Sequence, residues 1–215
     1  MKLTRSALIG SLVAASLAIA APVLAGPPLL CFPFETGGAK TLPMKTGDWK
    51  SVDPKYDVSH LTADTLALLA PANPVVARME TIRRATIYAS THPQVAADLL
   101  TALQTRAAAR TETAPSAVFD FGYLVETYKQ ATFMFSSAVK GLDEINGYQL
   151  VLKAAALQSD PAMEFGAAVI AQGSSNAALR AEYRGHLERA IAGAKTDAVL
   201  SASVTKHFGN TGELR

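Results

Sequence analysis

The chain has 215 residues, of which 49% are hydrophobic and 18% charged, with 20 basic against 18 acidic residues. This length is sufficient for one domain with a substantial core, or for two small ones. The low charge and high apolar content exclude an intrinsically disordered chain. The single cysteine excludes a disulfide framework within the chain.

Residues 1–25 have the pattern of a secretory signal peptide. Lys2 and Arg5 precede an uncharged apolar segment, and Ala25 ends a stretch of the compact residues that signal peptidase recognises. We expect cleavage after Ala25 and a periplasmic or secreted protein with no membrane span after cleavage. Two alternatives are an uncleaved membrane anchor and a lipoprotein attached through Cys31. The residue before Cys31 is not small, which disfavours lipid attachment.

Removal of this segment changes the charge balance. Residues 1–25 contain two basic residues and no acidic ones, so residues 26–215 carry no formal net charge. Neutrality and export together argue against a nucleic-acid partner. We expect the partner to be a protein or a small ligand of the cell envelope.

Residues 26–57 differ in composition from the rest of the chain. Nine of these 32 residues are glycine or proline, which interrupts any helical periodicity. The segment is nevertheless rich in apolar side chains: Leu29, Leu30, Phe32, Phe34, Trp49 and Tyr56. We therefore expect an extended Pro/Gly-rich arm that lies across the helical body and completes a groove or a dimer contact.

Residues 58–215 are predicted to form an all-α domain. All but one of the alanines beyond residue 25 follow Leu61, proline is rare after Pro93, and the apolar spacing is helical. Short connections favour antiparallel hairpins. We expect about eight helices, with starts near Thr62, Asn73, Thr91, Ser116, Asn146, Ser159, Asn176 and Thr196.

Two helical architectures fit this pattern. Pro93 and Pro161 each begin a helix and are 68 residues apart, which is twice the roughly 34-residue period of tetratricopeptide repeats. An irregular array of TPR-like hairpins and a compact bundle both remain open. Residues 162–171 contain one charge, Glu164, and predict a central helix. We expect Gly173 to end that helix in the left-handed conformation.

Motifs of common catalytic and nucleotide-binding sites are absent from the sequence. Residues 37–41 end like a phosphate-binding loop but lack its first glycine, so we expect no cofactor. Cys31 has apolar neighbours that predict a buried, inert thiol. A Cys31-linked dimer and a catalytic nucleophile are the alternatives.

His186 is the second catalytic candidate. It lies on an apolar helix face, and Glu182 precedes it by one turn. Such a pair can bind a metal, but no further Cys or His cluster completes four ligands, so we expect none. A partly buried histidine with satisfied hydrogen bonds is the simpler interpretation. His207, near the end of the last helix, is predicted to interact with the helix dipole.

Aromatic and basic clusters supply candidate binding residues. Aromatic side chains among charges can mark an interface, and clustered arginines can hold an acidic ligand. The alternatives are a half-buried helix face for the tyrosines and a solvated face with local ion pairs for the arginines. The candidates are Trp49, Tyr123, Tyr128, Arg83 and Arg84.

The stretches GPPLLCFPFETGGAKTLP, METIRRATIYASTHPQVAADLL and YLVETYKQA resemble uncharacterised exported bacterial proteins. The resemblance extends over most of the chain beyond residue 25. It assigns no particular activity to the chain. In that group a histidine often follows the cysteine and a tryptophan ends the motif, whereas Phe32 and Met44 stand here. A Cys–His role is thereby weakened. The sequence predicts an exported helical scaffold or binding module, with an enzyme that uses Cys31 or His186 in an interhelical pocket as the alternative.

Overall fold

The computed structural model describes residues 26–109, 114–135 and 139–209, so the predicted signal peptide lies outside the described residues. In these ranges the chain is all-α, as expected, and has no β-strand. No helix there is long and apolar enough to cross a membrane. The α-helices are α1 (Pro28–Cys31), α2 (Leu61–Leu68), α3 (Val75–Ala89), α4 (Pro93–Ala108), α5 (Ala114–Gln130), α6 (Gly147–Gln158), α7 (Pro161–Gly173), α8 (Ala177–Ala194) and α9 (Ala198–Phe208), and the 3₁₀ turns are η1 (Val58–His60), η2 (Thr132–Met134) and η3 (Leu142–Glu144).

Side-chain caps begin the C-terminal helices. Asn146, Asp160 and Asn176 each accept a hydrogen bond from a backbone N–H two or three positions later, at 2.8–3.0 Å. Asp197, and not the expected Thr196, caps α9 because its carboxylate accepts from two backbone N–H groups of the first turn. Local sequence therefore sets most of these helix starts.

Two helix ends differ from our expectation. The Asn73 side chain does not cap α3, because its amide donates to the Leu68 carbonyl (2.6 Å) at the end of α2. The helix that ends in the left-handed conformation is α6 and not α7, and the residue is Ser159 (φ 51°). Gly173 has no positive φ. Close packing leaves no room for a larger residue at this position, because a Cβ there would lie 2.5 Å from the Pro28 ring.

The central helices are α3 and α7. Nearly every side chain of α3 is buried, and residues 165–171 of α7 are buried without exception. The helix α7 packs against α1, α3, α5, α6 and α8. The low charge content of residues 162–171 therefore indicated its central position correctly.

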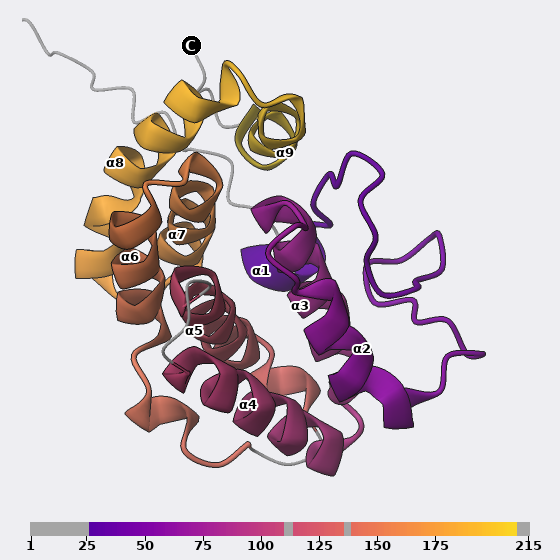
Figure 1. Cartoon of the computed structure of the whole chain (residues 1–215). Helices are drawn as coiled ribbons and strands as arrows, with labels where there is room; N and C mark the ends of the chain where they lie inside the picture. Colours follow the sequence, from indigo (N-terminus) through magenta and orange to yellow (C-terminus); the bar gives the residue numbers. More distant parts are fainter. Residues whose placement is uncertain (1–25, 110–113, 136–138, 210–215) are drawn as a thin grey trace, which may run out of the picture.

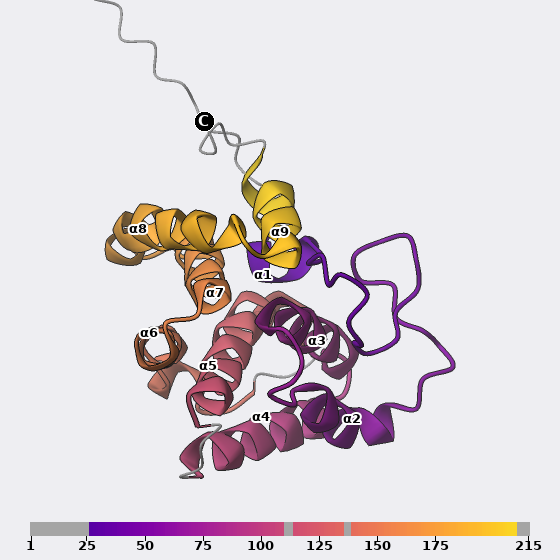
Figure 2. The same cartoon turned by 45° about the horizontal axis from the view of Figure 1, so that its top comes forward.

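The helices form a compact bundle with contacts between elements distant in sequence. Consecutive helices pack as hairpins, most extensively α5 with α6 and α7 with α8. The helix α3, however, also contacts α5, α7 and α9, whereas helices of a solenoid contact only neighbouring repeats. Figures 1 and 2 show α6, α7 and α8 together on one side of α5 and α3, and α9 lying over α3.

The arm, residues 26–57, begins with α1 packed against α7 and α3, and beyond α1 it follows the side of α2 and α3 that faces away from α8 in both views (Figures 1 and 2). It is not extended throughout, because Pro28–Cys31 form the single turn α1. Proline fits the first position of a helix, where the chain needs no N–H donor. Leu29 and Leu30 of this turn are fully buried.

Candidate functional site

A buried carboxylate binds the arm to α3. Glu80 is fully buried, and it accepts hydrogen bonds from the Phe34 backbone N–H (3.1 Å), from Arg83 Nε (2.7 Å) and Nη2 (2.8 Å), and from Arg84 Nε (2.7 Å). Burial raises the pKa of Glu80, but the bonds and charges of the two arginines outweigh it and leave the pKa below its usual value. Glu80 is therefore an ionised acceptor inside the protein.

The same two arginines bind carbonyl groups of the arm. Arg83 Nη1 donates to the carbonyls of Leu30 (2.9 Å) and Trp49 (3.0 Å), and Arg84 Nη1 donates to that of Leu42 (2.5 Å). The alternative of a solvated face is therefore wrong for Arg83, which is 2% exposed. Its charge is balanced by the buried carboxylate, which sequence reasoning missed, and it fixes the path of the arm.

Two tyrosines continue these contacts. The Tyr88 hydroxyl donates to the Pro43 carbonyl (2.9 Å) and accepts from the Asp53 N–H (2.9 Å). The Tyr56 ring lies 4.8 Å from the Tyr88 ring, between centroids, and its hydroxyl donates to Asp64 Oδ2 (2.8 Å). Burial raises the pKa of both hydroxyls, and the Asp64 bond adds to the rise at Tyr56. Both remain neutral donors at ordinary pH.

A pocket of about 350 Å³ lies where the arm meets the junction of α3 and α4. The arm and the turn that follows it contribute Lys50, Val52, Asp53, Pro54, Tyr56 and Val58. The helical junction contributes Ile87, Tyr88, Ser90, Thr91 and His92, and Met134 of η2 completes the lining. Half of this arm pocket is therefore made by the arm region.

The arm pocket combines an apolar wall with open polar groups. Val52, Ile87 and Met134 belong to a small apolar cluster. Asp53 Oδ1 accepts from the N–H of a neighbouring residue, and Oδ2 has no partner among the described residues. Lys50 likewise has no ion pair within the described chain. Such a mixture is typical of small-molecule sites, which place a few polar groups in an apolar cavity.

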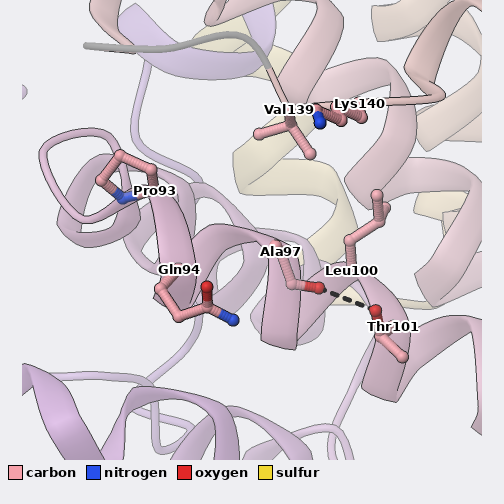
Figure 3. Close-up of a pocket in the computed structure, with 7 residues that line it drawn as sticks. All are labelled: Pro93, Gln94, Ala97, Leu100, Thr101, Val139 and Lys140. Atoms are coloured by element: carbon pink, nitrogen blue, oxygen red, sulfur yellow. Dashed lines mark hydrogen bonds between the residues drawn. The ribbon is translucent and has the colours of Figure 1, made fainter.

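A second pocket, of about 280 Å³, lies along α4 (Figure 3). Its lining is Pro93, Gln94, Ala97, Leu100 and Thr101, with Val139 and Lys140 opposite them. The Thr101 hydroxyl donates to a carbonyl of its own helix (2.9 Å), and Lys140 is the one charged residue of the lining. This pocket offers fewer open polar groups than the arm pocket.

His186 lies in a polar cluster between α6, α7 and α8. Its Nδ1 is 2.6 Å from Glu164 Oε2, and its Nε2 is 2.9 Å from the Tyr148 hydroxyl, which donates to Glu182 Oε2 (3.0 Å). Arg189 Nε is 2.9 Å from the same Glu164 oxygen. Arg189 Nη2 lies 2.7 Å from the same Nδ1. Because a carboxylate oxygen only accepts and a guanidinium only donates, Nδ1 donates to Glu164 in the tautomer that protonates it and accepts from Arg189 in the other. Burial, followed by the Glu182 bond, raises the pKa of Tyr148.

The two catalytic candidates are not brought together by hydrogen bonds. Cys31 is partly buried in α1 and packs against the apolar cluster of Leu30. Burial raises the pKa of its thiol, and Arg83 lowers it by less. The partners of His186 come from α6, α7 and α8 instead. Among the described residues, no three Cys, His, Asp or Glu side chains are placed to hold a metal ion.

The other candidate binding residues have structural contacts. Tyr123 and Tyr128 are fully buried because α5 is packed against α3, α4, α6 and α7, which cover its faces. Trp49 is partly buried against the small apolar cluster, and the Arg84 side chain is 23% exposed. Of the five candidates, only Trp49 and Arg84 therefore retain exposed surface beside the arm.

His207 differs from its expected role at a helix end. Its ring is 2% exposed, stacks on Phe34 (4.5 Å between centroids, 9° between planes) and meets the edge of Phe165. Nδ1 lies 3.1 Å from the Ser203 carbonyl. Burial lowers the pKa of His207 to about 4, which leaves the imidazole neutral. The ring thus joins the arm to α9 by apolar packing.

A second buried arginine is paired across the core. Arg78 donates to Asp120 Oδ1 through Nη2 (2.6 Å) and Nε (3.1 Å), and both residues are almost completely buried. Burial raises the pKa of Asp120 to about 6, against the lowering effect of Arg78. Arg78 therefore belongs to the core.

Sequence reasoning missed most of the arm pocket. The Pro/Gly-rich composition and Trp49 directed attention to the arm, but Lys50 and Asp53 resemble ordinary surface residues. In the sequence, Tyr88 and His92 lie near helix ends. They come to lie opposite Asp53 only because of the path that the arm takes.

Comparisons of the chain with protein-family models, with curated proteins and with solved structures find no match.

Proposed function

We propose that this chain is an exported helical binding module that takes a small ligand in the arm pocket. The main observation that supports this proposal is the cavity of about 350 Å³ between the arm and the α3–α4 junction. Pockets that bind small molecules have volumes of about 300–1,000 Å³ and combine apolar walls with a few polar groups. The arm pocket has both properties.

The attachment of the arm supports this proposal. A loop of this length is unusual in a compact domain unless it is functional or a linker. Here side chains of α3 bind its main chain at Leu30, Phe34, Leu42 and Trp49. Such contacts hold the pocket wall in place before a ligand arrives, which reduces the entropic cost of binding.

The test uses a matched pair of pocket-filling variants. Thr91 lines the arm pocket and Thr101 lines the α4 pocket, and both are exposed. Ligand-observed NMR with a panel of small polar and aromatic compounds should detect binders to the unmodified protein. Thr91→Trp should weaken them by about tenfold or more, since it occupies the cavity, and Thr101→Trp should leave them unchanged. Absence of any binder, or loss with Thr101→Trp alone, would contradict the proposal.

Export is part of the proposal and rests on the signal-like pattern of residues 1–25. Mass spectrometry of the protein purified from an envelope fraction should give an N-terminus at Gly26. A diacylglyceryl mass on Cys31, or an intact N-terminus, would overturn it. For the scaffold, we favour a compact bundle over a TPR-like array because α3 contacts α5, α7 and α9.

An acid–base enzyme is the second candidate. The hydrogen-bonded series Glu164–His186–Tyr148 favours it, because such a series can move a proton. His186 and Tyr148 are buried, so a substrate has to displace the half-exposed Glu182 to reach them. Turnover of chromogenic ester and phosphoester substrates should then be lost in Tyr148→Phe. Absence of turnover in the unmodified protein would count against this candidate.

A further inference from the structure

The arm pocket presents charges of both signs. Lys50 and Asp53 come from the same segment of the arm and both line the cavity. Neither forms an ion pair among the described residues, whereas the buried carboxylates Glu80 and Asp120 are each paired with arginine. The pocket therefore offers one cation and one anion that are open to a ligand.

Asp53 is held in a defined orientation. Its backbone N–H donates to the Tyr88 hydroxyl (2.9 Å), and its Oδ1 accepts from the Lys55 N–H (3.0 Å). Oδ2 is left to accept from a ligand. The C-terminal end of α3, where Ile87 lines the cavity, adds the negative end of a helix dipole. This side of the pocket attracts a positive group.

His92 adds a second acceptor in its neutral form. Its Nδ1 lies 3.1 Å from the Tyr88 carbonyl oxygen and 3.1 Å from Thr91 Oγ1. Because the carbonyl can only accept and a hydroxyl can also accept, the tautomer with the hydrogen on Nδ1 satisfies both contacts. The Nε2 of the neutral imidazole then has a free lone pair. An ammonium group can thus donate to Asp53 and His92, and Lys50 remains for a carboxylate.

We propose that the ligand of the arm pocket is a small zwitterion with an apolar side chain, a free α-amino acid. The inference rests on the function proposed above. Asp53 and His92 receive the ammonium group, Lys50 receives the carboxylate, and the wall of Val52, Ile87 and Met134 receives the side chain. The volume of about 350 Å³ lies at the low end of small-molecule sites and suits a ligand of this size.

The first test changes the ligand and leaves the protein intact. Calorimetric titration with the free protein amino acids should detect binding of an apolar one. Its N-acetyl derivative lacks the ammonium group and its amide lacks the carboxylate. Each should bind at least about tenfold more weakly, because each loses the hydrogen bonds of one charged group to the pocket.

The second test assigns each charge to its residue. Asp53→Asn should reduce the penalty for N-acetylation, of which His92 and the dipole of α3 keep a part, while the penalty for amidation remains unchanged. Lys50→Met should reduce the penalty for amidation and leave the penalty for N-acetylation unchanged. Asp48→Asn and Lys45→Met change charge equally at exposed arm positions outside the pocket lining and should leave both penalties intact. Thermal denaturation of each variant checks that it is folded.

The outcomes separate this inference from the function on which it rests. Equal binding of the free amino acid and its amide would indicate a simple amine ligand and overturn the inference. Binding of uncharged panel compounds that Thr91→Trp abolishes, without any amino-acid binding, would overturn it and leave the binding pocket supported. Absence of all binding would overturn both.

Discussion

Gly122 in α5 and Gly147 in α6 bring the backbones of the two helices into direct contact. A Cβ on Gly122 would lie 2.6 Å from the Gly147 carbonyl oxygen, and one on Gly147 would lie 2.5 Å from the Gly122 oxygen. Backbone atoms cannot rotate out of the way. We expect Gly122→Ala to lower the free energy of unfolding by about 2 kcal/mol in urea denaturation, as overpacking does.

Gly185→Ala is the matched control for this contact. The nearest atom to a Cβ there is Arg189 Nη1 at 3.5 Å, which is an ordinary contact at the end of a flexible side chain. Alanine is also favoured over glycine in a helix by about 0.5–1 kcal/mol. Gly185→Ala should therefore be neutral or slightly stabilising. Similar losses at both sites would contradict the helix contact as the cause.

Arg83 should be important for the attachment of the arm. Arg83→Met leaves the carbonyls of Leu30 and Trp49 without this donor and removes one of the cations on Glu80. We expect a loss of about 3 kcal/mol in unfolding free energy, as for other broken buried ion pairs. Hydrogen exchange in the arm should become faster.

Arg180 provides the control for that variant. It is exposed on α8, and the hydrogen bonds it donates go to the carbonyls of Ser174 and Ser175 in the connection between α7 and α8. Arg180→Met should change the unfolding free energy by no more than about 0.5 kcal/mol. If the two variants are equally stable, or if arm exchange is unchanged in Arg83→Met, the arm is not held as described.

His207 should make stability fall in acid. Its pKa is about 4 in the folded protein and 6.5 in the unfolded chain, so the unfolded state binds more protons between these values. The resulting contribution is present above pH 6.5 and is lost as the pH falls towards 4, for a total of about 3 kcal/mol. Urea denaturation at several pH values measures this loss.

His207→Phe removes the titrating group and keeps an aromatic ring in the contact with Phe34. The difference in unfolding free energy between the two proteins should therefore shift in favour of the variant from pH 6.5 to 4. Asp120, whose pKa is raised to about 6, acts in the opposite direction but is common to both proteins. Parallel pH curves would show that His207 is not buried in its neutral form.

The cluster around His186 should be energetically coupled. His186→Phe removes the imidazole that contacts Glu164, and Tyr148→Phe removes the hydroxyl on the other side of the ring. Each variant should lose about 1–3 kcal/mol of unfolding free energy. The double variant should lose less than the sum, by more than about 0.5 kcal/mol. His60→Phe, at an exposed position, should be nearly neutral; strict additivity would contradict the coupling.

The features that sequence predicted well are local ones. Asn146, Asp160 and Asn176 begin their helices because a capping side chain bonds to the backbone only two or three residues away. The Pro/Gly composition of residues 26–57 likewise prevents long helices wherever the segment lies. The helical class of the chain and the central position of α7 follow from similar short-range patterns.

The features that sequence missed depend on distant partners. Arg78 resembles a surface residue until Asp120, 42 positions away, is placed beside it. His207 resembles a charged helix end until Phe34 and Phe165 enclose it. Tyr128 was a plausible binding residue because its neighbours in sequence are charged. In the structure it is buried, because other helices pack against α5. The arm pocket could not be predicted for the same reason.

Because the arm forms part of the wall of the arm pocket, the binding of a ligand there depends on whether the arm is attached to α3. On the proposed function, detachment of the arm would remove Lys50, Asp53 and Tyr56 from the cavity and leave no binding-competent site. The measured dissociation constant of a ligand then equals the intrinsic constant divided by the fraction of molecules with the arm attached. If the pocket binds ligands as proposed, a substitution at Arg83, whose guanidinium lines neither described pocket, should weaken every ligand by one common factor and leave the selectivity among them unchanged.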